Sequence, residues 1–476
     1  MNLPLLAPLL SRRDSLRGLA CGFGYLALAV LAAPAEAAGG ALLQRRGPRF
    51  PPRAKRVIFL FMQGGPSQVD TFDHKPEIER LDGKKMPFDD VRTLANTGAR
   101  GSDQRVMKSP WSFARYGQSG RWVSELFPNV ARRVDDLCFI HSLHTEGVAH
   151  GPATLFLHCG ATNFVRPSMG AWITYGLGTE NEDLPGFITI CPTLAHGGVK
   201  NWGSAFLPAR YQGVPLGVAS RSSSEAQVKY IRNQRWTREQ QRHQLDLLNE
   251  LNRDYLAAAG PEAALEARIG SFELAFRMQE QMPTVQNYSD ESAATLSLYG
   301  MDDPVTENFG RQCLLARRFA ERGVRFIQVT HSDSQVQWDQ HSDLKSGHEK
   351  NAREVDRPIA GLLQDLKQRG LLDDTLVMWG GEFGRTPVAQ GKNGRDHNPE
   401  GFTIWLAGGG VKRGFKYGAT DDYGYFAVDQ KMHIHDLHAT LLFLLGLDHE
   451  KLTYRYGGRD FRLTDVAGEI HREILA

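Results

Sequence analysis

Acidic and imidazole side chains recur in three short segments of the C-terminal half of the chain. The first segment contains Asp339 and His341, the second contains Glu382, and the third contains Asp396 and His397. Carboxylates combined with imidazoles suit zinc, whereas more oxygen-rich sets suit calcium, magnesium or manganese. We therefore expect these five residues to bind a divalent metal ion if the three segments meet in the fold.

Predicted strands precede these segments and would position them. The apolar run 375–380 ends in glycine directly before Glu382, and the run 324–330 leads into His331 and the Asp339 segment. Such runs are typical of buried parallel strands, and open α/β sheets bind ligands at the carboxyl ends of their strands. Glu382, Asp396 and His397 would then lie on loops. The structural alternative for Glu382 is an ion pair across its own loop.

Cationic side chains lie close to the predicted metal ligands. Arg385 follows Glu382 and Arg395 precedes Asp396, and His331 begins the segment that leads to Asp339. A guanidinium group pairs with a sulfate, phosphate or carboxylate through two parallel hydrogen bonds. We expect Arg385, Arg395 and His331 to contact an anionic group of the substrate.

The order of the predicted elements indicates the fold class. Strand-like runs alternate with amphipathic helices over most of the chain, which is typical of a mostly parallel sheet covered by helices on both faces. Between residues 222 and 300 the pattern becomes helical, beginning at a capping box formed by Thr237 and Gln240. We expect a helical insertion at 222–300 that divides one α/β domain into the parts 56–221 and 301–476.

The first residues have the pattern of an export signal. A twin arginine, Arg12-Arg13, precedes the apolar segment 19–33 and the small residues 35–37. This predicts a twin-arginine signal peptide at 1–37, recognition by the twin-arginine export machinery, and a periplasmic or extracellular location. The Arg-, Gly- and Pro-rich segment 38–55 is expected to be a flexible lead-in.

Composition excludes some functions and leaves others open. The formal net charge is only +2 and no basic tract follows the lead-in, so we expect no nucleic-acid partner. The four cysteines after the signal show no Cys-x-x-Cys spacing, which argues against a thiolate zinc site. We expect His435 and His438 to support the last helix, and Asp73 and His348 to be solvated.

Seven motifs resemble the alkaline-phosphatase superfamily, which includes the sulfatases, and in particular a family of exported sulfatase-like proteins. They are Gly64–Asp73, Arg166–Gly170, Trp338–His341, Gly381–Pro387, Gly394–His397, Ala407–Gly410 and His435–Leu442. The resemblance implies a three-layer α/β/α sandwich. It also implies hydrolysis or transfer of sulfate or phosphate esters at a metal site.

Two features of the chain depart from that superfamily. Gln63 and Gly64 stand where the first strand usually ends in a metal-binding aspartate. The segment beginning at His150 replaces the usual Cys/Ser-x-Pro-x-Arg motif, so no formylglycine can form. Because imidazole can act as a nucleophile or general base, His150 is the first candidate for the missing nucleophile, or alternatively a metal ligand, and Ser67 is the second.

Together these patterns favour an exported, metal-dependent hydrolase of sulfate or phosphate esters, with a small molecule or a polysaccharide as substrate. A metal-activated water or His150 would attack the ester, and Arg385 would steady its anionic group. Two alternatives remain open. One is a non-catalytic protein that binds an anion or glycan on the same scaffold, and the other is a structural component of the cell surface.

Overall fold

A computed structural model describes residues 48–87, 105–228, 231, 233–260, 262–333 and 336–476. The predicted signal peptide and residues 38–47 of the predicted lead-in lie outside the described residues. Within the described part, no helix is both long enough and apolar enough to cross a membrane.

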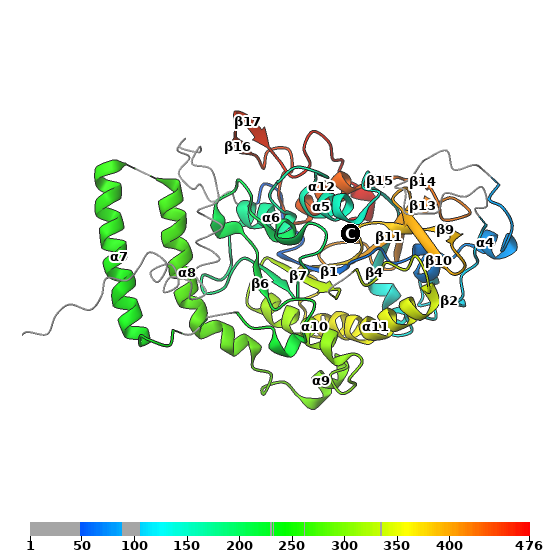
Figure 1. The fold of residues 1–476 in the computed structure, drawn as a ribbon, viewed down its shortest axis with the longest axis horizontal. Helices are drawn as coiled ribbons and strands as arrows, with labels where there is room; N and C mark the ends of the chain where they lie inside the picture. The colour runs from blue at the N-terminus through cyan, green and yellow to red at the C-terminus, as the bar shows by residue number, and fades with distance from the viewer. Residues whose placement is uncertain (1–47, 88–104, 229–230, 232, 261, 334–335) are drawn as a thin grey trace, which may run out of the picture.

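A nine-stranded sheet forms the centre of the described structure (Figure 1). Its strands are β1 (Arg56–Met62), β4 (Leu137–His144), β5 (Phe187–Ile190), β6 (Val214–Leu216), β7 (Phe326–His331), β8 (Thr375–Gly380), β11 (Phe402–Ala407), β12 (Phe415–Tyr417) and β15 (Met432–His433). The order is β12-β4-β11-β8-β1-β7-β5-β6, with β15 also paired to β4. All pairs are parallel except those of β11, which runs antiparallel to β4 and β8.

Helices cover both faces of this sheet (Figure 1). One face carries α5 (His150–Cys159), α6 (Met169–Leu177) and α12 (Ile434–Leu444), and the other carries α10 (Glu307–Glu321) and α11 (Leu344–Gln368). In β1, Ile58 and Leu60 pack into the α10–α11 core, whereas Phe59 and Phe61 pack into the opposite core. This follows from the alternation of side chains along a strand. The predicted three-layer α/β/α fold is confirmed.

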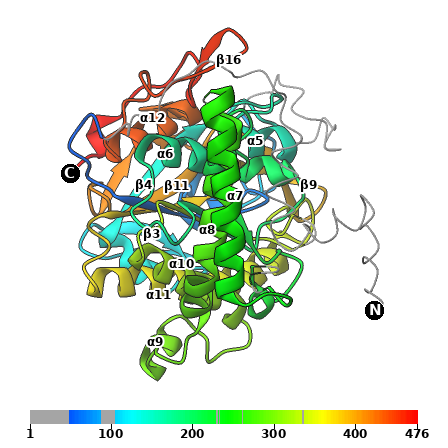
Figure 2. The ribbon, with the colours of Figure 1, turned by 90° about the vertical axis from the view of Figure 1, so that its left-hand side faces the viewer.

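The predicted helices between residues 222 and 300 are present and project away from the sheet (Figures 1 and 2). They are α7 (Arg238–Ala259), α8 (Ala263–Gln286) and α9 (Ala293–Leu298). The capping box at Thr237 and Gln240 is formed at the start of α7. No side chain of α7 is buried, whereas α8 contributes Met278, Met282 and Val285 to the core beneath α10.

The segment between β8 and β11 differs from the expected loop. It forms an antiparallel ribbon of β9 (Gly384–Gln390) and β10 (Gly394–Asn398). Gly391 turns the chain between the two strands with a φ of +60°, which glycine adopts without a steric cost. Asp396 and His397 therefore belong to a strand; His397 pairs with Arg385, whereas Asp396 lies at an irregularity of the ribbon and donates its N–H to the Thr386 hydroxyl at 3.2 Å.

The remaining short elements surround the sheet. They are α3 (Gln68–Thr71), α4 (Pro76–Arg80), the hairpin β2 (Phe113–Tyr116) with β3 (Arg121–Ser124), the pair β13 (Ala419–Thr420) with β14 (Ala427–Asp429), and the hairpin β16 (Tyr454–Tyr456) with β17 (Arg459–Phe461). Short 3-10 segments link several of them. The four described cysteines, Cys138, Cys159, Cys191 and Cys313, are free and buried.

Several histidines and Asp73 are buried in this fold. His435 and His438 hydrogen-bond through Nε2 to the carbonyls of Gly160 and Leu157, so α12 is tied to α5 as expected. The expectation that His348 and Asp73 are solvated is wrong. His348 is fully buried and accepts the N–H of Ser67, and Asp73 is buried beside Lys75.

Replacing leucine by alanine should destabilise the protein much more on the buried face of α12 than on the exposed face of α7. Leu441→Ala removes a completely buried side chain of α12, so we expect a loss of about 2–5 kcal/mol in the free energy of unfolding. Leu251→Ala in α7, where the leucine is 59% exposed, should cost less than about 1 kcal/mol. Urea denaturation measures both. Equal losses would mean that α7 is covered in solution.

Buried neutral histidines predict that stability decreases in acid. Burial lowers the pKa of His141 and His158 to about 4 and that of His348 and His438 to about 3. Below pH 6.5 the unfolded chain takes up protons that the folded chain excludes. The free energy of unfolding should therefore fall by roughly 1.4 kcal/mol per pH unit for each such histidine as the pH drops from 6.5 towards 4.

Denaturation curves recorded between pH 7.5 and pH 4.5 test this dependence. His438→Gln removes one of the four buried imidazoles. The free energy of unfolding should then fall less steeply with decreasing pH, by the roughly 1.4 kcal/mol per pH unit that one histidine contributes. His243→Gln changes an exposed histidine of α7 and is the matched control. A wild-type free energy of unfolding that does not change over this range would contradict the prediction.

Candidate metal centre

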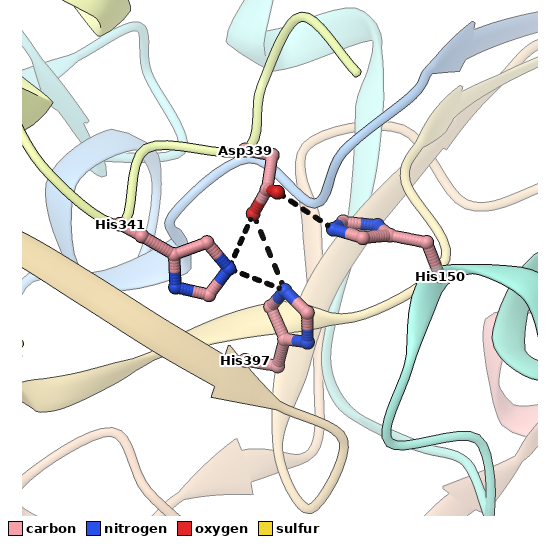
Figure 3. Close-up of side chains that lie close together, drawn as sticks. All are labelled: His150, Asp339, His341 and His397. Carbon is pink, nitrogen blue, oxygen red and sulfur yellow. Dashed lines mark hydrogen bonds and ion pairs between the residues drawn. The ribbon is translucent and has the colours of Figure 1, made fainter. Parts of the chain in front are cut away.

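Four side chains from distant parts of the chain meet at one edge of the sheet. His150 is the first residue of α5, Asp339 and His341 follow β7, and His397 lies in β10. Parallel strands β7 and β8 end at this edge, and antiparallel β11 begins there, so the segments before and after these strands come together. One ligand atom from each residue lies within 4.8 Å of all the others (Figure 3).

The carboxylate of Asp339 lies at the centre of the group (Figure 3). Its Oδ1 is 2.9 Å from Nε2 of His341 and 3.2 Å from Nε2 of His397, and its Oδ2 is 3.1 Å from Nε2 of His150. The Nε2 atoms of His341 and His397 are 3.0 Å apart. Three imidazole Nε2 atoms and one carboxylate thus share a space small enough for a single ion.

The other ring nitrogen of each histidine is held by an acceptor outside the group. Nδ1 of His150 lies 2.6 Å from Oε1 of Glu382, and Nδ1 of His397 lies 2.9 Å from the carbonyl of Val148. Nδ1 of His341 bonds the side-chain oxygen of Gln390. A proton on each Nδ1 satisfies these acceptors and leaves the lone pair of each Nε2 directed at the shared space. Metal-binding histidines are oriented in this way.

The electrostatics of the group favour a cation. Burial opposes the ionisation of Asp339, but hydrogen bonds donated by the three histidines when their Nε2 atoms carry protons, together with the charge of Arg385, outweigh it and hold the pKa of Asp339 well below its usual value. Burial also disfavours protonation of His150, yet Asp339 and Glu382 raise the pKa of that histidine. Burial lowers the pKa of His397 to about 4, against the influence of Asp339. A bound cation would replace a proton shared by these groups.

Glu382 lies behind the group and touches it only through His150. Its side chain is completely buried, and both oxygens accept the backbone N–H of Gly64, at 3.0 and 3.1 Å. The residue expected as a metal ligand is thus placed where it orients His150. The chain directly after β1 thus supplies a backbone donor to Glu382.

Arg385 is also completely buried, and its guanidinium group hydrogen-bonds Asp339 and the neighbouring backbone. It donates to Oδ1 of Asp339 at 2.7 Å and to the carbonyls of Gly65 and Trp338 at 3.0 and 3.2 Å, and it also bonds the carbonyls of Gly64 and Arg395. These contacts connect the loops after β1 and β7. Arg385, expected to hold an anionic substrate group, instead fixes the position of Asp339.

Two more candidates form a separate buried network. Arg395 pairs with both oxygens of Asp70, at 2.6 and 3.1 Å, and the hydroxyl of Ser67 donates to the same carboxylate at 2.5 Å. Arg395 and Ser67 are both completely buried. The structure therefore does not bring the proposed anion-binding arginine or the second nucleophile candidate to the four-residue group.

His331 and Asp396 lie next to the group and help to shape it. His331 accepts the indole N–H of Trp338 on Nδ1 and bonds Glu354 through Nε2, both at 2.9 Å, and so supports the residue before Asp339. Oδ1 of Asp396 accepts the N–H of His397 at 2.8 Å. Neither residue is part of the four-residue group.

His196 was not singled out from the sequence but lies beside the group. Its ring centre is 5.1 Å from that of His150, and its backbone has a φ of +48°, in the left-handed region that non-glycine residues rarely adopt. Gly197 and Gly198 continue this left-handed segment. Burial lowers the pKa of His196. The pair of glycines was the only sequence signal for this loop.

Comparisons with solved structures give similarities of fold. The chain is similar to PsFucS1 sulfatase from Pseudoalteromonas sp. (13% identity, TM-score 0.36), covering 84% of this chain and 69% of that one. It is similar to the lipoteichoic acid synthase LtaP from Listeria monocytogenes (10% identity, TM-score 0.35), covering 89% and 78%. It is also similar to a magnesium-bound variant of TAB5 alkaline phosphatase (10% identity, TM-score 0.36), covering 83% and 99%.

Comparisons of sequence identify the family. No curated protein matches the chain. One family model matches residues 54–475, which include all four residues of the group and the whole described sheet. The chain therefore belongs to the family described as "Protein of unknown function (DUF1501)".

Proposed function

We propose that this protein is a metal-dependent hydrolase of sulfate or phosphate esters. The observation that carries the proposal is the convergence of three Nε2 atoms and the Asp339 carboxylate, with the Nδ1 atom of every histidine next to an acceptor. Lone pairs that face one another at about 3 Å repel unless a cation or proton lies between them. We assign His150, Asp339, His341 and His397 as the ligands.

The ligand set favours zinc among the divalent ions considered. Three nitrogens and one carboxylate oxygen are typical of zinc, whereas calcium and magnesium prefer sets of oxygen atoms. A zinc ion, when bound, would polarise an ester oxygen and lower the pKa of a water molecule. With His150 used as a ligand, the histidine is a poor nucleophile, which favours water as the attacking group.

The residues around the group suggest how a substrate would be held. The ring of Phe383 lies 4.9 Å from that of His150 and 4.3 Å from that of His397, so it forms an apolar wall on one side. On another side, no hydrogen bond or ion pair engages the ring nitrogens of His196 within the described residues. We propose that His196 contacts the substrate. We also propose that the protein is exported through the twin-arginine machinery and acts on small-molecule or polysaccharide esters.

A metal-dependent binding protein is the second candidate. It is favoured by the burial of Arg385 and Arg395, because both guanidinium groups are engaged within the protein and cannot clamp a sulfate or phosphate. On this alternative the same ion would bind an anion or glycan without cleaving it.

Metal analysis combined with turnover measurements tests the proposal. We expect about one zinc per purified chain. His397→Ala should contain less than about a tenth of that, because the site then lacks one of its four ligands. Hydrolysis of aryl sulfates or aryl phosphates should fall by at least about a hundredfold in Asp339→Asn. His243→Ala, in exposed α7, is the matched control for both measurements.

The possible outcomes separate the candidates. Equal metal content in wild type and His397→Ala would contradict the metal site itself. A full complement of metal without turnover on either aryl panel would support the binding protein instead of the hydrolase.

The position of Glu382 predicts a graded effect on metal affinity. Glu382→Gln keeps the shape of the side chain but weakens its hydrogen bond to His150. Replacing a residue that hydrogen-bonds a metal-binding histidine typically lowers metal affinity by about ten- to a hundredfold. Competition with a coloured chelator measures the change. If Glu382→Gln instead lost its metal as completely as His397→Ala, Glu382 would be a direct ligand.

A further inference from the structure

A second pocket lies on the α10–α11 side of the sheet, apart from the metal centre. Its volume is about 110 Å³. It is formed where the chain after α3, the β2–β3 hairpin, β4 and β12 meet. It is lined by Phe72, Asp73, His74, Lys75, Gly120, Arg121, Trp122, Phe139, His141 and Lys416. None of these residues belongs to the four-residue metal group or contacts it directly in the structure.

Three cations and one carboxylate line this pocket. Nζ of Lys75 lies 3.2 Å from Oδ1 of Asp73, and the hydroxyl of Thr420 also donates to Asp73. The negative charge of Asp73 is therefore neutralised within the wall. Arg121 and Lys416 remain, and together they leave an excess of positive charge.

These two cations have unused hydrogen-bonding capacity. Arg121 donates its Nε–H to the carbonyl of Ser119 at 3.0 Å, and no residue in the described part of the chain engages its two terminal nitrogens. Lys416 is exposed on β12 and likewise has no hydrogen-bond or ion-pair partner among the described residues. As far as the described residues go, both can bind an anionic group from solution.

The buried histidine of the pocket adds no further charge. Burial lowers the pKa of His141 to about 4, with Asp73 opposing and Lys416, Lys75 and Arg121 acting in the same direction as burial. All three cations are thus close enough to act on one ring. Nδ1 of His141 is held by the hydroxyl of Thr403 at 2.9 Å.

Aromatic rings also line the pocket. Trp122 is 37% exposed; its ring centre lies 4.5 Å from that of His74, which stacks on Phe113, and the guanidinium carbon of Arg115 lies 5.0 Å from the Trp122 ring centre. Phe72 and Phe139 add apolar surface. The part of Trp122 that remains exposed, beside these cations, suits a ligand with one apolar side and one charged group.

We propose that this pocket binds the sulfate or phosphate monoester group of a saccharide. At about 110 Å³ it is smaller than the roughly 300–1,000 Å³ of sites that enclose a whole ligand, so it has room for the charged group only. The sugar ring would lie outside the pocket, against Trp122. Arg121 and Lys416 bind the anionic oxygens through charge-assisted hydrogen bonds. This site does not require the metal centre to be catalytic.

Calorimetric titration with glucose 6-sulfate and glucose 6-phosphate tests this pocket. We expect at least one of the two to bind, and Arg121→Gln and Lys416→Gln each to weaken that binding by about tenfold, as expected for one charge-assisted hydrogen bond. Lys412→Gln removes an equal charge four residues before Lys416 and lines no part of the pocket, so it should bind like wild type. Thermal unfolding of each variant verifies that it is folded.

Control ligands and a variant of the metal centre show which chemical group binds and at which site. Glucose should not bind measurably, and inorganic sulfate should bind more weakly than the sugar monoesters. Asp339→Asn should retain the binding, so failure of the hydrolase proposal would leave this result unchanged. The proposal is overturned if neither monoester binds, if Lys412→Gln weakens binding as much as Lys416→Gln, or if Asp339→Asn abolishes it. Inorganic sulfate binding as tightly as the monoesters would replace the saccharide by a free anion.

Discussion

Asp339 lies between three imidazole nitrogens and one guanidinium, and these contacts join four segments that are far apart in the sequence: the loop after β1, the start of α5, the chain after β7 and the β9–β10 ribbon. Arg385 donates a hydrogen bond to the carboxylate and also bonds backbone carbonyls in the loops after β1 and β7. The imidazoles approach from α5, from the chain after β7 and from β10. A partly buried carboxylate in this setting is stable only when its charge is compensated, so the position of each segment depends on this one group.

The geometry of the sheet makes these contacts possible. Because β11 is antiparallel within a parallel sheet, the chain leaves β8 and enters β11 at the same edge. The connection forms the β9–β10 ribbon, and the paired strands place His397 rigidly opposite His341. A close approach at Gly64 matters too, because a Cβ atom there would lie 2.7 Å from the backbone nitrogen of Asp339. Only glycine allows the β1 loop to reach both Asp339 and Glu382.

Much of the fold could be predicted from local sequence patterns. Apolar runs identified β1, β7, β8 and β11, and amphipathic spacing identified α10, α11 and the helices of the insertion. These elements are set by interactions between neighbouring residues, which the sequence displays directly. The ribbon after β8 was missed because its strands, GRTPVAQ and GRDHN, show no apolar run and contain glycine and proline, and their pairing depends on the turn at Gly391.

For the candidate site, the sequence by itself determined which residue types were available and near which strands they stood. It named Asp339, His341 and His397 as metal ligands and His150 as a nucleophile or alternatively a ligand, and the structure brings these four residues together. Only the tertiary structure decided which contacts each residue makes. Glu382 hydrogen-bonds His150, Arg385 hydrogen-bonds Asp339, and Arg395 and Ser67 both hydrogen-bond Asp70. A carboxylate or arginine has the same chemistry in every position along a chain. Its task follows from burial and from the groups within about 3 Å, and those are brought together only by long-range packing.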